Sequence, residues 1–94
     1  MAVLDDVEIR ERLRLRPDWL LSGSEIVRLF VFADFFAAME FVNRVAEAAD
    51  KAGHHPDIDI RWNRVRLALS SHDAGGITER DFSLAAVIDS LFTA

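Results

Sequence analysis

The sequence predicts an α+β fold: a four-stranded antiparallel sheet with helices packed on one face, in the order α-β-β-α-β-β-α. Two pairs of short apolar runs, each pair joined by a turn-like segment, indicate two β-hairpins. A long stretch between the pairs repeats its apolar residues at helical spacing, and a shorter such stretch follows the second pair. With no internal linker, the 94 residues are expected to form one domain, residues 1–94.

The first helix is expected over residues 4–14. Asp5 and Asp6 place carboxylates at its start, where they suit the helix dipole, and Pro17 prevents its continuation. Four arginines alternate with other residues in this region, but two glutamates interrupt the run. A solvated face or a rim between subunits is therefore a better interpretation than a nucleic-acid surface. These residues are Arg10, Arg12, Arg14, Arg16, Glu8 and Glu11.

The first hairpin combines the apolar runs Trp19–Leu21 and Ile26–Phe32, because Ser22-Gly23-Ser24 between them is typical of a turn. The second run is apolar on both of its faces. One face carries Val27, Leu29 and Val31, and the other carries Ile26, Phe30 and Phe32. Only one face can meet the chain's own helices, so we expect a symmetric homodimer or homotetramer to cover the other.

The long helix is expected from Phe35 to about Ala52, with Asp34 as its N-cap and Gly53 at its C-terminal end. Its apolar residues follow the i, i+3, i+4, i+7 spacing of one buried face. They are Phe35, Ala38, Met39, Val42, Val45, Ala46 and Ala49, and the aromatic residues Phe35 and Phe41 are expected in the core.

The second hairpin is expected to turn near Asn63, with two strands that alternate between a buried and a polar face. The buried faces would be Ile58, Ile60 and Trp62 on the first strand, and Val65, Leu67 and Leu69 on the second. Thr78 and Asp81 then have the spacing of a capping box that opens the last helix. This helix is expected to bury Leu84, Val87, Ile88 and Leu91.

Composition limits the classes of function. The chain has no cysteine, which excludes disulfides and thiolate metal sites, and its net charge of −5 argues against nucleic acid as a partner. No apolar run approaches the roughly 20 residues of a membrane span, and the N-terminus has no signal-peptide core. We therefore expect a soluble protein of the cytoplasm.

The most informative feature is the grouping of all three histidines, His54, His55 and His72, in one region. The unperturbed pKa of histidine, about 6.5, allows proton transfer near neutral pH. Because the second hairpin returns toward its own start, we expect His72 to lie close to His54 and His55. Asp81 is one short loop away, and Asp50 lies in the last turn of the long helix. Three histidines beside acidic residues favour a site over solvated surface positions.

The spaced set of residues around the histidines resembles the signature of the pterin-4a-carbinolamine dehydratase family. It begins with Asp50, where the family more often has Glu, and with His54-His55-Pro56. It continues through Trp62-Asn63 and Val65, Leu69-Ser70-Ser71-His72-Asp73, Gly75-Gly76, Thr78-Glu79-Arg80-Asp81 and Leu84-Ala85. The N-terminal half also matches, through Trp19-Leu20-Leu21, Ile26, Phe30 to Phe32 and Asp34-Phe35.

The resemblance implies the same α+β fold, a homo-oligomer, and a hydro-lyase, 4a-hydroxytetrahydrobiopterin dehydratase. This enzyme removes water from 4a-hydroxytetrahydropterin to give quinonoid dihydropterin in tetrahydropterin recycling. The pterin is the substrate, and no cofactor is implied. Family position assigns the catalytic group to His54, His55 and His72, with His54 and His72 as the acid–base pair. It assigns substrate binding to Asp50, Pro56, Trp62, Arg80 and Asp81.

Three alternatives remain open at this point. Asp81 could serve only as a helix cap, although capping and a site role can coexist. A metal site is disfavoured, since adjacent histidines on an extended segment point in opposite directions and no HxH, HxxxH or HExxH spacing occurs. The alternative function is a non-catalytic, homo-oligomeric protein-interaction module on the same fold; the intact histidine set favours the enzyme.

Overall fold

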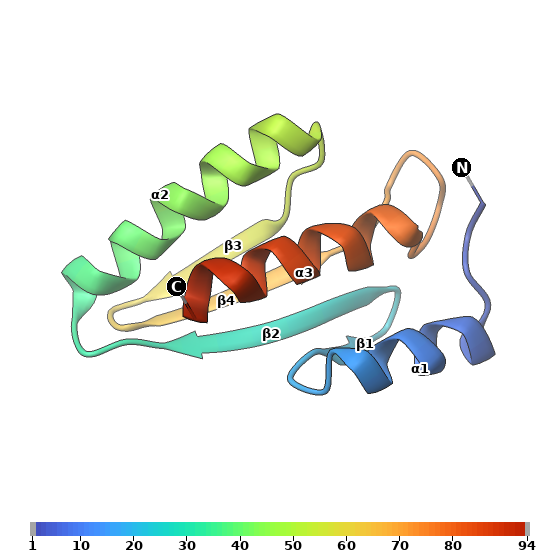
Figure 1. The fold of residues 1–94 in the computed structure, drawn as a ribbon, viewed down its shortest axis with the longest axis horizontal. Coiled ribbons are helices and arrows are strands. Elements are labelled where there is room, and N and C mark those ends of the chain that lie inside the picture. The colour runs from blue at the N-terminus through green and yellow to red at the C-terminus, as the bar shows by residue number, and fades with distance from the viewer. Residues whose placement is uncertain (1, 94) are drawn as a thin grey trace.

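The computed structural model describes residues 2–93 and contains the elements expected from the sequence (Figure 1). In chain order they are α1 (Asp6–Leu15), β1 (Leu20–Ser22), β2 (Glu25–Val31), α2 (Phe35–Ala52), β3 (Asp57–Arg61), β4 (Arg64–Leu69) and α3 (Glu79–Thr93). The predicted α+β fold and its α-β-β-α-β-β-α order are therefore confirmed. Within residues 2–93, no helix is both long enough and apolar enough to cross a membrane.

The sheet has the strand order β1-β2-β4-β3, with antiparallel pairing between all neighbours. Because β2 and β3 are each antiparallel to β4, they run parallel to one another. Parallel strands cannot be joined by a short turn, and α2 supplies the long connection that passes over β4 (Figure 1). The last strand in the sequence therefore lies between β2 and β3, beside the end of α2.

The core lies between the sheet and the three helices. The inward-facing residues of β2 and β4 are completely or almost completely buried: Ile26, Phe30, Val65, Leu67 and Leu69. The ring of Phe30 in β2 contacts the ring of Phe41 in α2, with centroids 4.8 Å apart. Ile9 of α1 and Ile88 of α3 belong to the same cluster.

The two ends of α2 follow the predicted cap chemistry. Ala37 N–H donates to the Asp34 side chain at 2.9 Å, which satisfies a free donor in the first turn. At the other end Gly53 has φ 62° and ψ 30°, a left-handed conformation that glycine adopts without strain. This turn stops the helix and leads the chain directly into His54 and His55.

A partly buried polar network, not anticipated from the sequence, links α3 to the first hairpin. The Asp89 carboxylate accepts hydrogen bonds from Trp19 Nε1 at 2.9 Å and from Arg28 Nη1 at 2.6 Å. The Arg28 guanidinium also lies over the Phe30 ring, 4.4 Å from its centroid. Both charged side chains are mostly, though not fully, removed from water, so Asp89 and Arg28 stabilise each other's position.

Six expected core residues are exposed, among them Trp62, which lies in the turn after β3. On α2, Phe35 is 50% exposed and Ala46 is also exposed, because both lie at the margin of the stripe formed by Ala38, Phe41, Val42, Val45 and Ala49. Val87 is 44% exposed, since it lies to one side of the face that carries Leu84 and Ile88. Ile58 and Ile60 do face the helices, opposite Leu67 and Val65, but β3 is an edge strand and the helices cover it incompletely.

We predict that glutamate has opposite effects at the neighbouring positions Phe30 and Val31. Phe30 is 1% exposed within the aromatic cluster, so Phe30→Glu should lower the free energy of unfolding by more than about 3 kcal/mol. Val31 lies on the open face of the sheet, and Val31→Glu should leave the fold intact. Urea denaturation followed by circular dichroism tests this. Equal losses of stability would contradict the assignment of the two faces.

Candidate active site

His54 is held in the interior at the end of α2. Its backbone N–H donates to Ala49 O at 3.2 Å, which fixes the residue directly after the left-handed turn at Gly53. The side chain is largely buried, and its Nε2 lies 2.5 Å from Asp81 Oδ1. Since Asp81 engages Nε2, Nδ1 is the ring nitrogen left for a bound molecule.

Asp81, in the first turn of α3, has no solvent-exposed surface and makes three hydrogen bonds. Oδ1 bonds to His54, while Oδ2 accepts from the backbone N–H of Thr78 at 2.9 Å and from Ser71 Oγ at 3.0 Å. Ser71 Oγ and Thr78 Oγ1 lie 2.8 Å apart and complete the network. The carboxylate therefore reaches back to the helix start, as the capping spacing predicted, and contacts His54 as well.

His55 points to the outside of the same turn. Its Nε2 lies 2.8 Å from Asp50 Oδ1, and both side chains are exposed. A carboxylate in the last turn of a helix opposes the helix dipole. The contact with His55 provides a local reason for Asp50 at this position.

His72 approaches from the other side, in the turn that follows β4. Ser71 and Gly76 form an isolated β-bridge, and Gly75 adopts φ 82° between them. This tight turn presents His72 to solvent. The return of the second hairpin thus brings His72 back to the end of α2, as expected.

These side chains border an open depression of about 250 Å³. Its lining residues are Gly53, His54, His55, Ser70, His72, Asp73 and Arg80. Arg80 pairs with Asp73, and this hydrogen bond lowers the pKa of the Asp73 carboxyl below its ordinary value. Arg80 Nε is buried, and within residues 2–93 it has no hydrogen-bond partner. A bound acceptor could satisfy it.

The structure brings most of the predicted site residues to this depression or next to it. His54, His55, His72 and Arg80 line the depression; Asp81 lies behind His54, and Asp50 lies beside His55. Pro56 follows His55 and is partly exposed. Trp62, which the resemblance assigned to substrate binding, does not line the depression of its own chain. It lies at the far end of β3, 66% exposed, about 16 Å of extended strand from Asp57.

Sequence reasoning missed the supporting roles of Ser71 and Thr78 around the buried carboxylate. Ser71 directly precedes His72, and Thr78 was assigned only a capping role. Asp73 lies in the turn after β4 and also pairs with Arg80. No spacing rule links a hydroxyl in one loop to a carboxylate in the next helix, so these contacts carry little local signal.

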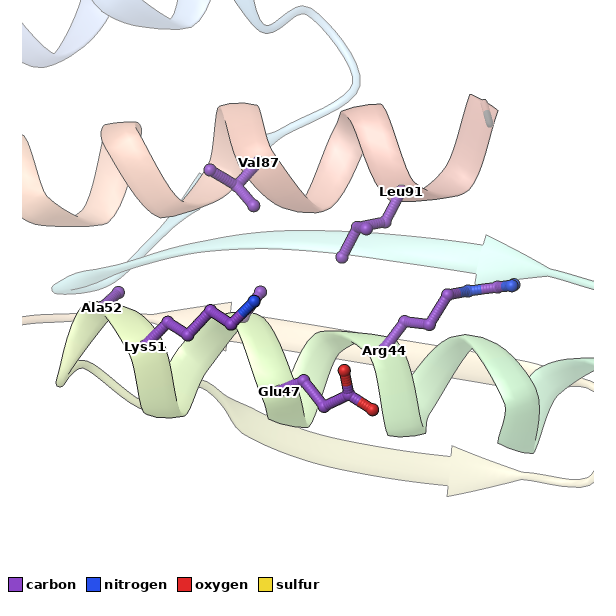
Figure 2. Close-up of a pocket in the computed structure, with 7 residues that line it drawn as sticks. Arg44, Glu47, Lys51, Ala52, Val87 and Leu91 are labelled. Carbon is purple, nitrogen blue, oxygen red and sulfur yellow. The ribbon is translucent and has the colours of Figure 1, made fainter.

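A second, larger hollow of about 580 Å³ lies between α2 and α3 (Figure 2). It is bordered by Arg44, Glu47, Ala48, Lys51, Ala52, Val87 and Leu91, which include no acid–base histidine. Its size alone does not make it the reaction site, since the chemically suitable groups gather at the smaller depression. Among the described residues there is no cluster of histidines and carboxylates that could hold a metal ion.

Comparison with known proteins shows the family of the chain. The family described as pterin 4 alpha carbinolamine dehydratase matches residues 2–91. The chain belongs to the pterin 4 alpha carbinolamine dehydratase family. A relative from Acidobacterium capsulatum, provisionally named a pterin-4-alpha-carbinolamine dehydratase, is 64% identical over 91 residues, covering 97% of this chain and 99% of its own. A similarly named relative from Chloroflexus aurantiacus is 62% identical, with 97% and 98% covered.

Solved structures agree with the fold of this dehydratase family. The crystal structure of a transcriptional coactivator/pterin dehydratase from Brucella melitensis has a TM-score of 0.92 and 33% identity, covering 97% of this chain and 99% of that one. A pterin dehydratase-like protein described as a RuBisCO assembly factor in the alpha-carboxysome has a TM-score of 0.66 and 21% identity, covering 81% and 88%. The latter similarity concerns the fold alone.

We predict that Asp81 is essential to the stability of this dehydratase-family domain. Asp81→Ala leaves His54, Ser71 and the Thr78 N–H without their acceptor in the interior, and should cost about 3–5 kcal/mol of unfolding free energy. Asp73→Ala is the matched control, because this carboxylate makes an exposed pair and its loss should leave the unfolding midpoint near that of the wild type. Similar midpoints for both variants in urea would contradict the role of the buried carboxylate.

Proposed function

We propose that the protein dehydrates 4a-hydroxytetrahydropterin to quinonoid dihydropterin in tetrahydropterin recycling. The reaction breaks the C4a–O bond and removes the proton from N5. The departing hydroxyl takes up a proton and leaves as water. One group must therefore deliver a proton and another must withdraw one, with no change in oxidation state and no need for a resident cofactor or metal.

The observation that carries this proposal is the pairing of two unlike histidines across one depression. His54 is largely buried and held by Asp81, whereas His72 is exposed on a turn. Imidazoles in such different surroundings can divide the donor and acceptor roles between them. The Asp81 carboxylate bonds to Nε2 of His54, which fixes the tautomer and the orientation of the ring.

The remaining residues of the depression are suited to hold the substrate. The third histidine of the catalytic group, His55, is held by Asp50 at the open side, and Pro56 keeps this segment extended. Arg80 offers donors to the oxygen and nitrogen atoms of a pterin. In this scheme His54 and His72 transfer protons, while His55, Asp50 and Arg80 orient the substrate.

A protein-interaction module is the second candidate function. Two observations favour it: the hollow between α2 and α3, and the description of the structural relative from Brucella melitensis as a transcriptional coactivator. Such a module does not require acid–base groups. Substitution of the histidines therefore separates the two candidates, because it should remove dehydration while leaving a docking function intact.

We predict that His54→Ala and His72→Ala each lower the rate of carbinolamine dehydration by about 10²-fold or more, because general acid–base groups typically contribute 10²–10⁴-fold. Stopped-flow absorbance with freshly generated 4a-carbinolamine measures this rate above the uncatalysed one. Glu40→Ala, on the exposed side of α2, is the control and should keep the wild-type rate. Wild-type turnover in both histidine variants, with intact circular dichroism spectra, would refute the acid–base assignment.

A further inference from the structure

Strand β3 presents a long, open edge of the sheet. All five of its residues are exposed, although the strand pairs along its whole length with β4 on its other side. The register Arg61↔Arg64 closes the hairpin, so the peptide groups of residues 57, 59 and 61 point toward β4. Those of Ile58 and Ile60 point toward the open edge. Proteins rarely leave such an edge uncovered.

The opposite edge of the sheet is a poorer docking surface. It is formed by β1, which has only three residues and follows Pro17 and Asp18 closely. Short edge strands are one of the ways in which proteins prevent further pairing. Additional strand pairing is therefore expected at β3.

The side chains of β3 suit a second copy of the same strand. Suppose that a two-fold axis passes through Ile60 and relates two antiparallel copies of β3. Asp59 of each subunit then lies opposite Arg61 of the partner subunit, and the two Ile60 side chains meet at the axis. Within one chain Arg61 Nε already donates to Asp59 at 3.1 Å, so the pair of strands would form a cluster of two carboxylates and two guanidinium groups. An axis through Asp59 would instead oppose two carboxylates, which is destabilising.

Trp62, directly after β3, carries a large apolar surface that its own chain leaves open, since its side chain is 66% exposed. Its φ of 51° belongs to the two-residue turn Trp62-Asn63 of the hairpin, which requires a positive φ. In the paired strands, the turn that carries Trp62 lies beside the start of the partner's β3, next to Ile58 of the partner subunit. From there the indole points along the edge that leads to Pro56 of the partner subunit.

We infer that Trp62 of each subunit completes the pterin site of the other. This inference rests on the proposed function. Apart from Gly53, the described residues that line the depression of one chain have polar side chains, and none of them is a large apolar or benzenoid group. An indole beside His55 and Pro56 would supply a surface on which the planar pterin ring can stack. The predicted role of Trp62 in substrate binding would then be fulfilled across the subunit interface.

The strand pairing is tested by cross-linking, which the absence of cysteine in the natural chain makes unambiguous. Across the proposed axis, the Cα atoms at position 60 would be about 5.5 Å apart, within disulfide range. Ile60→Cys should therefore form a covalent dimer on mild oxidation. Leu20→Cys, on the exposed β1 edge, is the matched control and should remain monomeric on a non-reducing gel. A cross-link at Leu20 but not at Ile60 would overturn the pairing.

The contribution of Trp62 in trans is tested by subunit complementation. Trp62→Ala should raise the KM of dehydration roughly tenfold, as loss of one aromatic stacking contact does, and Trp62→Phe should largely restore it. Co-refolding equal amounts of His54→Ala and Trp62→Ala yields mixed dimers in which one site has both native residues. At a substrate concentration well below the KM of Trp62→Ala, the mixture should reach about a quarter of the wild-type rate.

The outcomes separate this inference from the proposed function. If Trp62 acts within its own chain, the mixed dimer contains no site with both native residues, and the rate stays at the average of the two parent variants. That result would overturn the assignment in trans. If the wild type shows no dehydration at all, the proposed function fails, while the cross-link at Ile60 still reports on the strand pairing.

Discussion

The arrangement of the site depends on one buried carboxylate. Asp81 connects three parts of the chain that are distant in sequence: His54 at the end of α2, Ser71 after β4, and the start of α3 at Thr78. A carboxylate without solvent contact is costly unless each oxygen is engaged, so these contacts stabilise one another and are expected to form together. The hydrogen bond that starts the last helix is thus part of the same network that orients the buried histidine. Stability and chemistry are coupled at this residue.

The strand order brings the separate pieces of the site together. Because β4 is inserted between β2 and β3, its C-terminal end lies beside the point where α2 ends and β3 begins. His72 and the His54-His55 pair therefore meet at one edge of the molecule, although a complete hairpin separates them in the sequence. The left-handed turn at Gly53 fixes the approach of the first pair, and the tight turn at Gly75 fixes that of the third histidine.

The same fold leaves two kinds of surface for other purposes. The described residues that border the hollow between α2 and α3, and those on the open face of the sheet, include no histidine, so a partner could use these surfaces without contacting the proposed proton-transfer groups. Structural relatives described as a coactivator and as an assembly factor indicate that proteins of this architecture serve more than one purpose. The residues of the site, rather than the architecture, therefore distinguish an enzyme from an interaction module.

The sequence alone determined what depends on neighbouring residues. Apolar periodicity located the helices and strands, Asp34 and Gly53 marked the ends of α2, and the Thr78–Asp81 spacing indicated the cap of α3. The approach of His72 to His54 followed from hairpin geometry. Only the tertiary structure decided what depends on long-range pairing. The alternation of Ile58 and Ile60 predicted the correct face but not its exposure, because nothing local indicates that β3 lies at an edge. The contacts of Ser71 with Asp81, and of Asp89 with Trp19 and Arg28, join segments that meet only after the helices pack on the sheet.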